Sequence, residues 1–371
     1  MLKKFSVENF KGFQKRFILD FSRPGNYEFN TECVKDGVIS KSIIYGINGI
    51  GKSNLGLAIF DLIIHLAEKN KEEAKYTNYI NFDSEKPFAY FEYEFQFGND
   101  TILYKYSKSD PNSLVEESLS INDTEMIYYD YRERKGFSHF AGSESLTLES
   151  NSNNSRVKYV FNTAILKSDN KENAILIKFK DFVESMLLFY SLKNNGFIGF
   201  KNERDFLEDV IIKAGKVKDF ETFINTQGLH VSLVALDTPE GKKIYFKHKK
   251  GYIHFFAECS TGTSSLILLY SWLIYLEKCS FVYIDEFDAF YHYELSEMIV
   301  KELKKFTNVQ IVVTTHNTDL LNNDLLRPDC YYIICDEKIE SLNRLTIKDL
   351  RFAHNLQKMF KADAFKGTKI D

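Results

Sequence analysis

The final third of the chain carries the regular hydrophobic pattern of alternating helices and strands. Apolar residues at helical spacing cover residues 264–276 and 293–306, and short apolar runs typical of buried strands cover 280–284, 309–313 and 331–335. Strands that alternate with helices at this spacing form a parallel sheet with crossover helices. We therefore expect an α/β core whose functional edge lies at the carboxyl ends of the strands.

The earlier residues are patterned for antiparallel strands and for additional helices. Residues 2–10 and 17–21 predict an opening hairpin, and aromatic alternation over 88–106 predicts two strands around a turn at 98–100. The other predicted elements are a buried strand over 42–45, helices over 54–67, 174–192 and 203–214, and strands over 231–235 and 243–246. The sequence therefore predicts a mixed α/β fold.

A glycine-rich loop connects the predicted strand over 42–45 to the helix that follows. Residues 46–53 read Gly-Ile-Asn-Gly-Ile-Gly-Lys-Ser, which fits the phosphate-loop pattern G-x-x-x-x-G-K-[ST]. In such a loop the backbone N–H groups surround a polyphosphate, and the helix N-terminus adds a favourable dipole. We expect Lys52 to reach the β- and γ-phosphates and the Ser53 hydroxyl to hold Mg²⁺. The alternative is a glycine-rich turn with an incidental lysine.

Two carboxylates and a histidine end the next two predicted strands. Asp285 and Glu286 follow the strand over 280–284, where an acidic side chain can meet Mg²⁺ beside a phosphate loop. Asp285 is expected to hold the metal, and Glu286 to polarise the attacking water. His316 closes the strand over 309–313 and can sense the γ-phosphate by a hydrogen bond. The alternatives are two solvated acids and a surface histidine.

Residues 260–265 (Ser-Thr-Gly-Thr-Ser-Ser) precede the apolar helix and form a second candidate anion site. Small hydroxylated residues at a helix N-terminus can bind an anion, which here would be the nucleotide of a partner subunit. An ordinary capping loop explains the same residues. The segment taken alone is ambiguous.

In this order, the landmarks resemble the ABC-type ATPase heads of the SMC and RecF group. The resemblance is closest to small bacterial ATPases of abortive-infection and OLD-like phage-defence systems. The residues that carry it are 5–13, 46–54, 258–263, 285–292, 314–317, 326–329 and 350–352. It covers both ends of the chain and is weak across residues 76–226.

This resemblance implies a P-loop NTPase fold of the SMC-head type with a mixed sheet. The ATPase core would comprise residues 1–75 and 227–371, around an inserted strand and helical lobe of residues 76–226. ATP and Mg²⁺ are the implied cofactors, with Ser53 and Asp285 as metal ligands. The implied catalytic residues are Glu286 and His316, and the implied nucleotide contacts are Lys11, Gly46, Asn48, Gly49, Gly51, Lys52, Ser53, Asn54, Ser260, Gly262 and Thr263.

The resemblance also implies a head-to-tail homodimer or a higher homo-oligomer, in which the partner's Ser260 and Gly262 complete each site. Two positions depart from the family pattern. Gln96 lies in a strand pattern and does not match the expected nucleotide-contacting glutamine loop, and Phe290-Tyr291 is bulkier than usual after the acidic pair. The long spacing from Ser53 to Ser260 does not suit a transporter ATPase, and it is too short for SMC arms.

Composition and charge limit the alternatives. The formal net charge is −4, so any contact with DNA must be local. The five cysteines are irregularly spaced, which favours a reducing cytoplasm over a disulfide framework. The longest mainly apolar run, residues 266–276, is shorter than the roughly 20 residues that cross a bilayer. The N-terminus lacks the apolar block of a signal peptide, and we expect no membrane partner.

Three functions remain open. The first is an ATP-driven switch that regulates a separate nuclease or toxin in defence against phage, because few residues follow His316 and they contain no Asp-x-Asp metal pair. The second is a RecF-like repair ATPase that binds DNA through the lysines of residues 242–250, although a solvated turn is the simpler explanation of these lysines. The third is a scaffold that binds ATP and rarely hydrolyses it, which the intact Glu286 disfavours.

Overall fold

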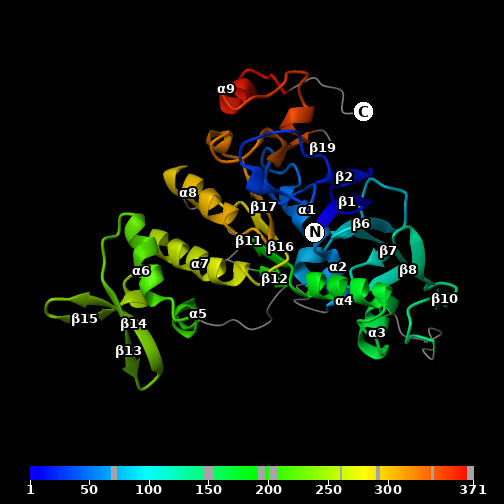
Figure 1. Ribbon diagram of the computed structural model, residues 1–371, viewed down its shortest axis with the longest axis horizontal. Helices are drawn as coiled ribbons and strands as arrows, with labels where there is room; N and C mark the ends of the chain where they lie inside the picture. The colour runs from blue at the N-terminus through cyan, green and yellow to red at the C-terminus, as the bar shows by residue number, and fades with distance from the viewer. Residues whose placement is uncertain are drawn as a thin grey trace.

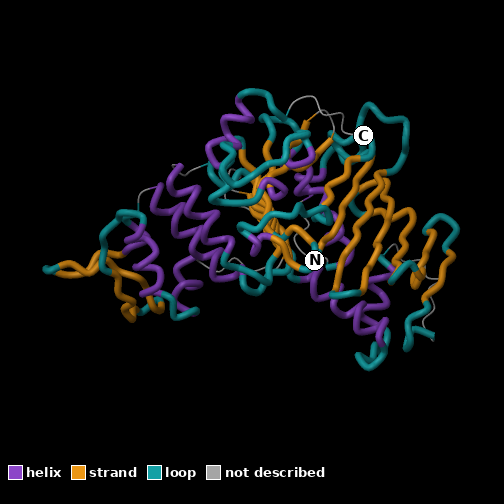
Figure 2. Tube along the Cα trace, turned by 45° about the horizontal axis from the view of Figure 1, so that its top comes forward, coloured by secondary structure: helices purple, strands orange, loops and turns teal. Residues whose placement is uncertain are grey.

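The computed structural model describes residues 1–67, 73–144, 154–190, 197–199, 207–259, 261–289, 293–335 and 338–365. In these residues the strands form two seven-stranded sheets, a three-stranded sheet and one short pair (Figure 1). The first two sheets build the body of the molecule, and the three-stranded sheet lies at the end of an arm. Figure 2 shows the two large sheets side by side, with the small sheet far from the antiparallel one.

The central sheet has a parallel middle and antiparallel edges, in the order β12-β11-β16-β17-β5-β18-β19. Its strands are β5 (Lys41–Tyr45), β11 (Leu187–Tyr190), β12 (Phe197–Gly199), β16 (Phe281–Asp285), β17 (Gln310–Thr315), β18 (Tyr331–Cys335) and β19 (Lys338–Ser341). Every residue of β5, β11, β16 and β17 is buried, as expected for parallel strands covered on both faces.

The second large sheet is antiparallel, in the order β10-β9-β8-β7-β6-β1-β2. Its strands are β1 (Leu2–Glu8), β2 (Phe17–Asp20), β6 (Ala89–Phe97), β7 (Asp100–Asp110), β8 (Ser113–Ile121), β9 (Thr124–Asp130) and β10 (Lys135–Ser138). Burial alternates along β6, and its inward aromatic side chains form stacked and tilted ring pairs with those of β7. One face therefore belongs to the core and the other faces solvent.

Helices fill the space between and around the two sheets. Those of the body are α1 (Lys52–Ile59), α2 (Asp61–Leu66), α3 (Arg156–Thr163), α4 (Lys171–Glu184), α8 (Tyr293–Lys304) and α9 (Leu356–Lys361). Tyr93 of β6 donates a hydrogen bond to Ala58 O of α1 at 2.9 Å, and Tyr283 of β16 donates one to Lys52 O at 2.7 Å. The helix after the phosphate loop is thus fixed to both large sheets.

The remaining short elements connect these parts. They are the strand pair β3 (Val34–Lys35) and β4 (Val38–Ile39), and the 3-10 helices η1 (Thr31–Cys33), η2 (Glu73–Tyr76), η3 (Phe255–Ala257), η4 (Thr318–Leu320), η5 (Pro328–Cys330) and η6 (Leu342–Arg344). Within the described ranges, no helix has both the length and the apolar character needed to cross a membrane.

The arm has a small core of its own. It contains α5 (Leu207–Lys213), α6 (Val217–Thr226), α7 (Thr261–Leu276) and the strands β13 (Leu233–Thr238), β14 (Gly241–His248) and β15 (Gly251–His254). Helix α7 is apolar on more than one side because it belongs to two cores. Ile267 and Tyr270 pack in the arm, whereas Leu268 and Leu269 pack in the body.

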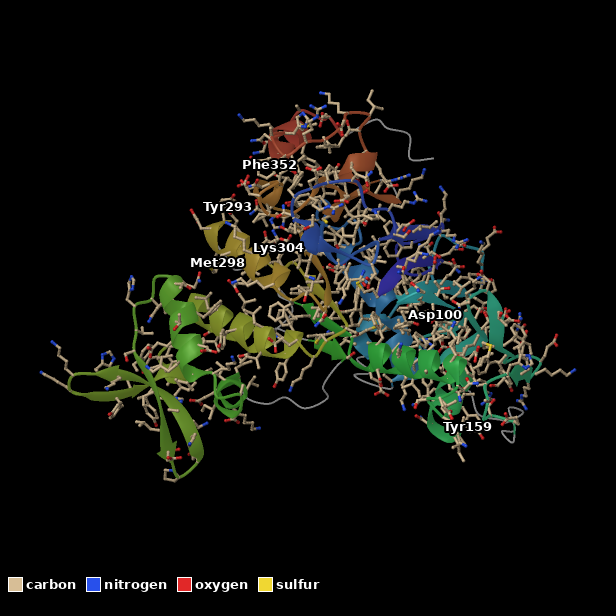
Figure 3. The ribbon with its side chains drawn as sticks, in the orientation of Figure 1. Asp100, Tyr159, Tyr293, Met298, Lys304 and Phe352 are labelled. Carbon is tan, nitrogen blue, oxygen red and sulfur yellow. The ribbon has the colours of Figure 1, made fainter. Side chains whose placement is uncertain are left out.

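Helix α8 also contacts the arm. Met298, labelled in Figure 3, accepts a hydrogen bond from Gln227 Nε2 at 2.9 Å. At the end of the same helix, Lys304 bonds to Asn30 Oδ1 at 2.6 Å and pairs with Glu32 at 2.9 Å. One helix thus connects the arm, the central sheet and the N-terminal loop.

Most of the predicted elements are confirmed, with two corrections. The opening hairpin, the strand before the glycine loop, the strand pair around residue 98 and the C-terminal alternation all form. The helix predicted over 54–67 is wrong as a single element, because it breaks at Phe60 into α1 and α2. The helix predicted over 174–192 ends at Glu184, and residues 187–190 form strand β11 instead.

The predicted division at residues 76–226 also needs correction. The segment contributes β6 to β10 to the antiparallel sheet, β11 and β12 to the central sheet, and α5 and α6 to the arm. The arm continues through β15 and α7, beyond residue 226. The physical reason is that β11 pairs with β16 in the middle of the central sheet, so residues 187–190 are integral to that sheet.

Candidate functional site

The glycine loop connects β5 to α1 and closes around the Lys52 ammonium group. Gly49 and Gly51 have φ angles of 82° and 111°, a left-handed region that favours glycine. Lys52 Nζ donates hydrogen bonds to Gly46 O at 2.7 Å and to Ile47 O at 3.3 Å. The Lys52 ammonium thus folds back onto the carbonyl groups of its own loop.

The start of α1 contacts the carboxylate at the end of β16. Ser53 Oγ donates a hydrogen bond to Asp285 Oδ2 at 2.5 Å, and Thr314 Oγ1 donates one to Asp285 Oδ1 at 2.8 Å. Burial raises the pKa of Asp285, while the two hydroxyl groups oppose that shift. The Asp285 carboxylate thus has partners that a cation could replace.

Glu286 lies between Lys52 and His316. Its Oε1 is 3.2 Å from Lys52 Nζ, and its Oε2 is 3.2 Å from His316 Nδ1. Glu286 has a φ of 51°, unusual for a residue with a side chain, and its N–H donates to Thr314 Oγ1 at 2.8 Å. Thr314 therefore contacts both acidic residues: its hydroxyl hydrogen bonds to the Asp285 carboxylate, and its oxygen accepts from the backbone N–H of Glu286.

These groups line one hollow of about 330 Å³ at the carboxyl ends of the parallel strands. Its lining residues are Asn48, Gly49, Gly51, Lys52, Ser53, Asn54, Tyr190, Asp285 and Glu286. The hollow joins a glycine-rich loop, a lysine and two carboxylates in one place. That combination suits a polyanion together with a divalent cation.

The model of the family described as "AAA domain, putative AbiEii toxin, Type IV TA system" matches residues 41–322. The chain belongs to this AAA family. The matched residues run from β5 past the end of β17, so they contain every lining residue of the hollow. Membership supports an ATPase, and the glycine loop fits the nucleotide binding that this class of domain implies.

Solved structures resemble the AAA chain at low identity. The SMC head bound to the C-winged helix domain of ScpA is 15% identical, with a TM-score of 0.46 over 91% of this chain and 96% of that one. The SMC head domain from Thermotoga maritima is 14% identical, with a TM-score of 0.44 over 91% and 97% of the two chains. An SMC head domain bound to the C-terminal domain of ScpA from Pyrococcus furiosus is 13% identical, with a TM-score of 0.43 over 91% of this chain and 95% of that one. Among curated proteins, none matches this chain.

The donor set of the AAA domain fits Mg²⁺ bound with phosphate groups. Mg²⁺ takes oxygen ligands at about 2.0–2.1 Å, so neighbouring ligands lie about 2.9 Å apart. Ser53 Oγ and Asp285 Oδ2 already lie side by side at 2.5 Å. In the described part of the chain no group of three His, Cys, Asp or Glu side chains could hold a metal. The remaining ligands would come from phosphate and water, as is usual for Mg²⁺.

The turn before β2 supports the loop of the AAA domain from outside the hollow. A Cβ on Gly51 would lie 3.5 Å from the Phe13 ring, and one on Gly12 would lie 3.6 Å from Asn54 Nδ2. Lys11 itself does not line the hollow, and its Nζ donates to Thr77 O at 2.8 Å. The structure thus places the expected basic turn beside the loop with the Lys11 ammonium directed elsewhere.

The second candidate anion site lies only partly within the described residues. Ser260 is outside them, as are Phe290 and Tyr291. Gly262 and Thr263 belong to the first turn of α7. Their predicted role in a partner's site therefore stays a prediction.

Sequence reasoning missed Tyr190 and Thr314. Tyr190 ends β11 in register with Asp285, and Lys75 Nζ lies 4.0 Å from the centre of its ring. Its segment was assigned to a helix, and the four consecutive apolar residues after Met186 are the signal that could have revealed a buried strand. Thr314 was included in the histidine segment 314–317 without a role of its own, because its two hydrogen bonds join neighbouring strands that are distant in the sequence.

Proposed function

We propose that this protein hydrolyses ATP with Mg²⁺ and acts as an ATP-driven switch. The observation that carries the proposal is the meeting of Lys52, Ser53, Asp285 and Glu286 around one hollow at the end of the parallel strands. Each group has a partner of the kind that a nucleotide and its metal would replace. The AAA family match covers all four residues.

Lys52 and Glu286 would change partners when nucleotide binds. The Lys52 ammonium would leave Gly46 O and Glu286 for the β- and γ-phosphates. Ser53 and Asp285 would hold Mg²⁺, which neutralises charge on the phosphate oxygens when bound. Glu286 would then be free to accept a proton from the attacking water. His316, 58% exposed and adjacent to Glu286, would orient that carboxylate and sense the γ-phosphate.

A head-to-tail homodimer or a higher homo-oligomer would complete the site, with ATP bound between subunits. An exposed apolar residue on the glycine loop supports this arrangement, because Ile47 is 74% exposed and could be covered by a second subunit. The partner's Ser260, Gly262 and Thr263 would contact the nucleotide held by Lys52 of the first subunit. Hydrolysis would then depend on dimer geometry, and the dimer could report the ATP state to other proteins.

The controlled output would be a separate effector, a nuclease or toxin of an OLD-like, abortive-infection type of defence against phage. Support comes from the family description, which names a toxin and a type IV toxin–antitoxin system. We place the activity in the cytoplasm, because the five irregularly spaced cysteines of the sequence suit a reducing compartment better than a disulfide framework.

The test is the native mass of tagged Glu286→Gln protein, purified from its own host in Mg²⁺-ATP. This variant should bind ATP and hydrolyse it about 10²–10⁴-fold more slowly than wild type. A homodimer that carries a second polypeptide supports the regulated-effector function, whereas a bare homodimer contradicts it. A monomer in ATP contradicts the shared site, and equal turnover by wild type and variant indicates a scaffold that does not hydrolyse ATP.

A further inference from the structure

The tip of the arm carries an unusual concentration of positive charge. Residues 241–254, which form β14, its turn and β15, contain five lysines and two histidines and no carboxylate. The chain as a whole has a formal net charge of −4. Figure 1 shows this hairpin at the far end of the arm, away from both large sheets.

The hairpin narrows to two strands where the charge is densest. Strand β13 accompanies β14 only as far as the pair Leu233–Phe246. The Lys247 N–H still donates to Ser232 O at 2.8 Å, and beyond it only β14 and β15 continue. Lys247 lies opposite Tyr252. Opposite residues of an antiparallel pair project from the same face, so a lysine and an aromatic ring are neighbours on this ribbon.

The lysines at the tip are exposed and have no carboxylate partner. Lys247, Lys249 and Lys250 form no ion pair with the described residues. Elsewhere in the arm lysines do pair, as Lys218 does with Glu221 at 2.8 Å and Lys243 with Glu208 at 3.3 Å. The tip therefore differs from an ordinary solvated surface, on which opposite charges are interspersed.

Large side chains that would usually be covered are also exposed at the tip. Tyr252 is 53% exposed and Ile253 is 47% exposed, and both belong to the edge strand β15. An exposed edge strand can pair with another chain, and proteins either prevent that pairing or use the edge for binding. An aromatic ring beside unpaired lysines offers apolar contact with base edges in a groove in addition to charge.

We propose that the β14–β15 tip binds double-stranded DNA, with the ribbon in the major groove and the three lysines on the phosphate backbone. The major groove of B-DNA is about 12 Å wide and admits a two-stranded β-ribbon. The major groove of duplex RNA is deep and narrow and does not admit side chains in this way. The lysines contact phosphates, so binding is independent of base sequence. The inference does not rest on ATP hydrolysis and holds without nucleotide.

The experiment measures binding of a fluorescent DNA duplex of mixed sequence to the full chain without ATP, from 50 to 200 mM salt. Three phosphate contacts correspond to a slope of log affinity against log salt of about −2.7. The variant Lys247→Ala/Lys249→Ala/Lys250→Ala should bind about 100-fold more weakly at 100 mM salt and lose most of the slope. The matched control Lys301→Ala/Lys305→Ala/Lys348→Ala removes the same charge outside the arm and should bind as wild type does.

Each other outcome overturns the assignment. Absence of binding by wild type at 50 mM salt rules out the site, and an equal loss in the control variant indicates attraction by overall charge alone. If poly-glutamate displaces the labelled duplex as well as unlabelled DNA does, the tip is a surface for an acidic protein. If duplex RNA binds with the same affinity as duplex DNA, the major-groove geometry is wrong. Tyr252→Ala separates apolar contact from charge, because it should weaken binding about 10-fold and leave the salt slope unchanged.

Discussion

Two buried aspartates, one in each half of the body, differ in how their charge is satisfied. Asp61 begins α2 beneath the antiparallel sheet and is 0% exposed. Asp285 ends β16 in the central sheet and is 6% exposed. Asp61 pairs with a lysine, whereas Asp285 receives hydrogen bonds from two hydroxyl groups and borders a hollow.

The environment of Asp61 is saturated by the protein itself. Lys108 Nζ donates to Asp61 Oδ1 at 2.6 Å, and Tyr106 and Tyr79 each donate a hydroxyl hydrogen bond at 2.9 Å. Burial raises the pKa of both tyrosines, so they remain protonated donors. Nearby, the buried Glu117 accepts hydrogen bonds from tyrosine, serine and backbone donors.

The difference separates a structural charge from a functional one. Lys108, Tyr106 and Tyr79 all donate to Asp61 within the core, so the Asp61 carboxylate has no site at which a ligand could bind. The Asp285 carboxylate and the nearby Lys52 ammonium hold neutral or exchangeable partners beside an open hollow. A buried charge is therefore a candidate ligand-binding group only where its partners can be replaced.

The largest expected effect tests the structural side of this comparison. Lys108→Met leaves the Asp61 carboxylate buried without its cation, and should lower the free energy of unfolding by about 3–5 kcal/mol. Urea denaturation followed by circular dichroism measures the change. The exposed pair Lys301–Glu297 is the control, and Lys301→Met should change stability by less than about 1 kcal/mol. Equal effects of the two substitutions would contradict the comparison.

The second test concerns the functional side. Lys52 is 4% exposed, almost as buried as Lys108, yet Lys52→Ala should leave the fold intact. It should weaken ATP binding about 100-fold, because charge-assisted hydrogen bonds to phosphate contribute about 1.5–3 kcal/mol each. Isothermal titration calorimetry measures the affinity and urea denaturation the stability. Unchanged affinity with lost stability would show that Lys52 is structural.

A third lysine sharpens the comparison because it lacks any carboxylate partner among the described residues. Lys41 starts β5, is 3% exposed, and donates to Val309 O at 2.6 Å and to Ser40 O at 3.3 Å. Burial lowers the pKa of Lys41 from 10.5 to about 8. The unfolded chain therefore binds more protons between these values, and the stability contribution of this position rises with pH across that window.

Lys41→Met removes the free-energy cost of burying the charged ammonium group, and should raise the free energy of unfolding by about 1–3 kcal/mol at pH 7. The gain over wild type should shrink as the pH rises from about 8 towards 10.5, since wild-type Lys41 is then neutral. Urea denaturation of both proteins at pH 7 and pH 9.5 measures the difference. A gain that does not change with pH would mean that the two proteins differ in packing alone.

The smallest effect concerns the positioning of the two site carboxylates. Thr314→Val removes the hydrogen bonds to Asp285 Oδ1 and from the Glu286 N–H. We expect about a 10-fold lower kcat with an unfolding free energy lowered by about 1–2 kcal/mol. Thr315→Val, which loses its bond to Asp288 at 2.7 Å, is the matched control and should affect kcat less. A larger loss of kcat in Thr315→Val than in Thr314→Val would mean that Thr314 does not position Glu286.

Local patterns predicted the phosphate loop, the two acidic residues and His316, because each follows a recognisable strand. The structure brings Lys52, Ser53, Asp285 and Glu286 together as those patterns require. What could not be predicted depends on contacts between distant residues. The pair Asp61–Lys108 and the hydrogen bonds of Thr314 have no signature in the sequence.

Strand β11 shows why short apolar runs are misassigned. Residues 187–190 follow α4 with only a brief interruption, so their hydrophobicity continued a helical pattern. A run of four apolar residues fits a strand and a helix equally well, and only pairing with β16 decides between them. The aromatic residue that ends this strand, Tyr190, was therefore missed as part of the hollow.

The apolar helix α7 has a consequence for how the arm can be manipulated. Ile267 and Tyr270 pack in the core of the arm, so deleting residues 207–259 would expose an apolar surface on a helix that also packs in the body. The truncated protein should therefore aggregate on expression, whatever the arm does in the cell. The arm is therefore not a detachable module, and its role is best probed by single exchanges at its tip.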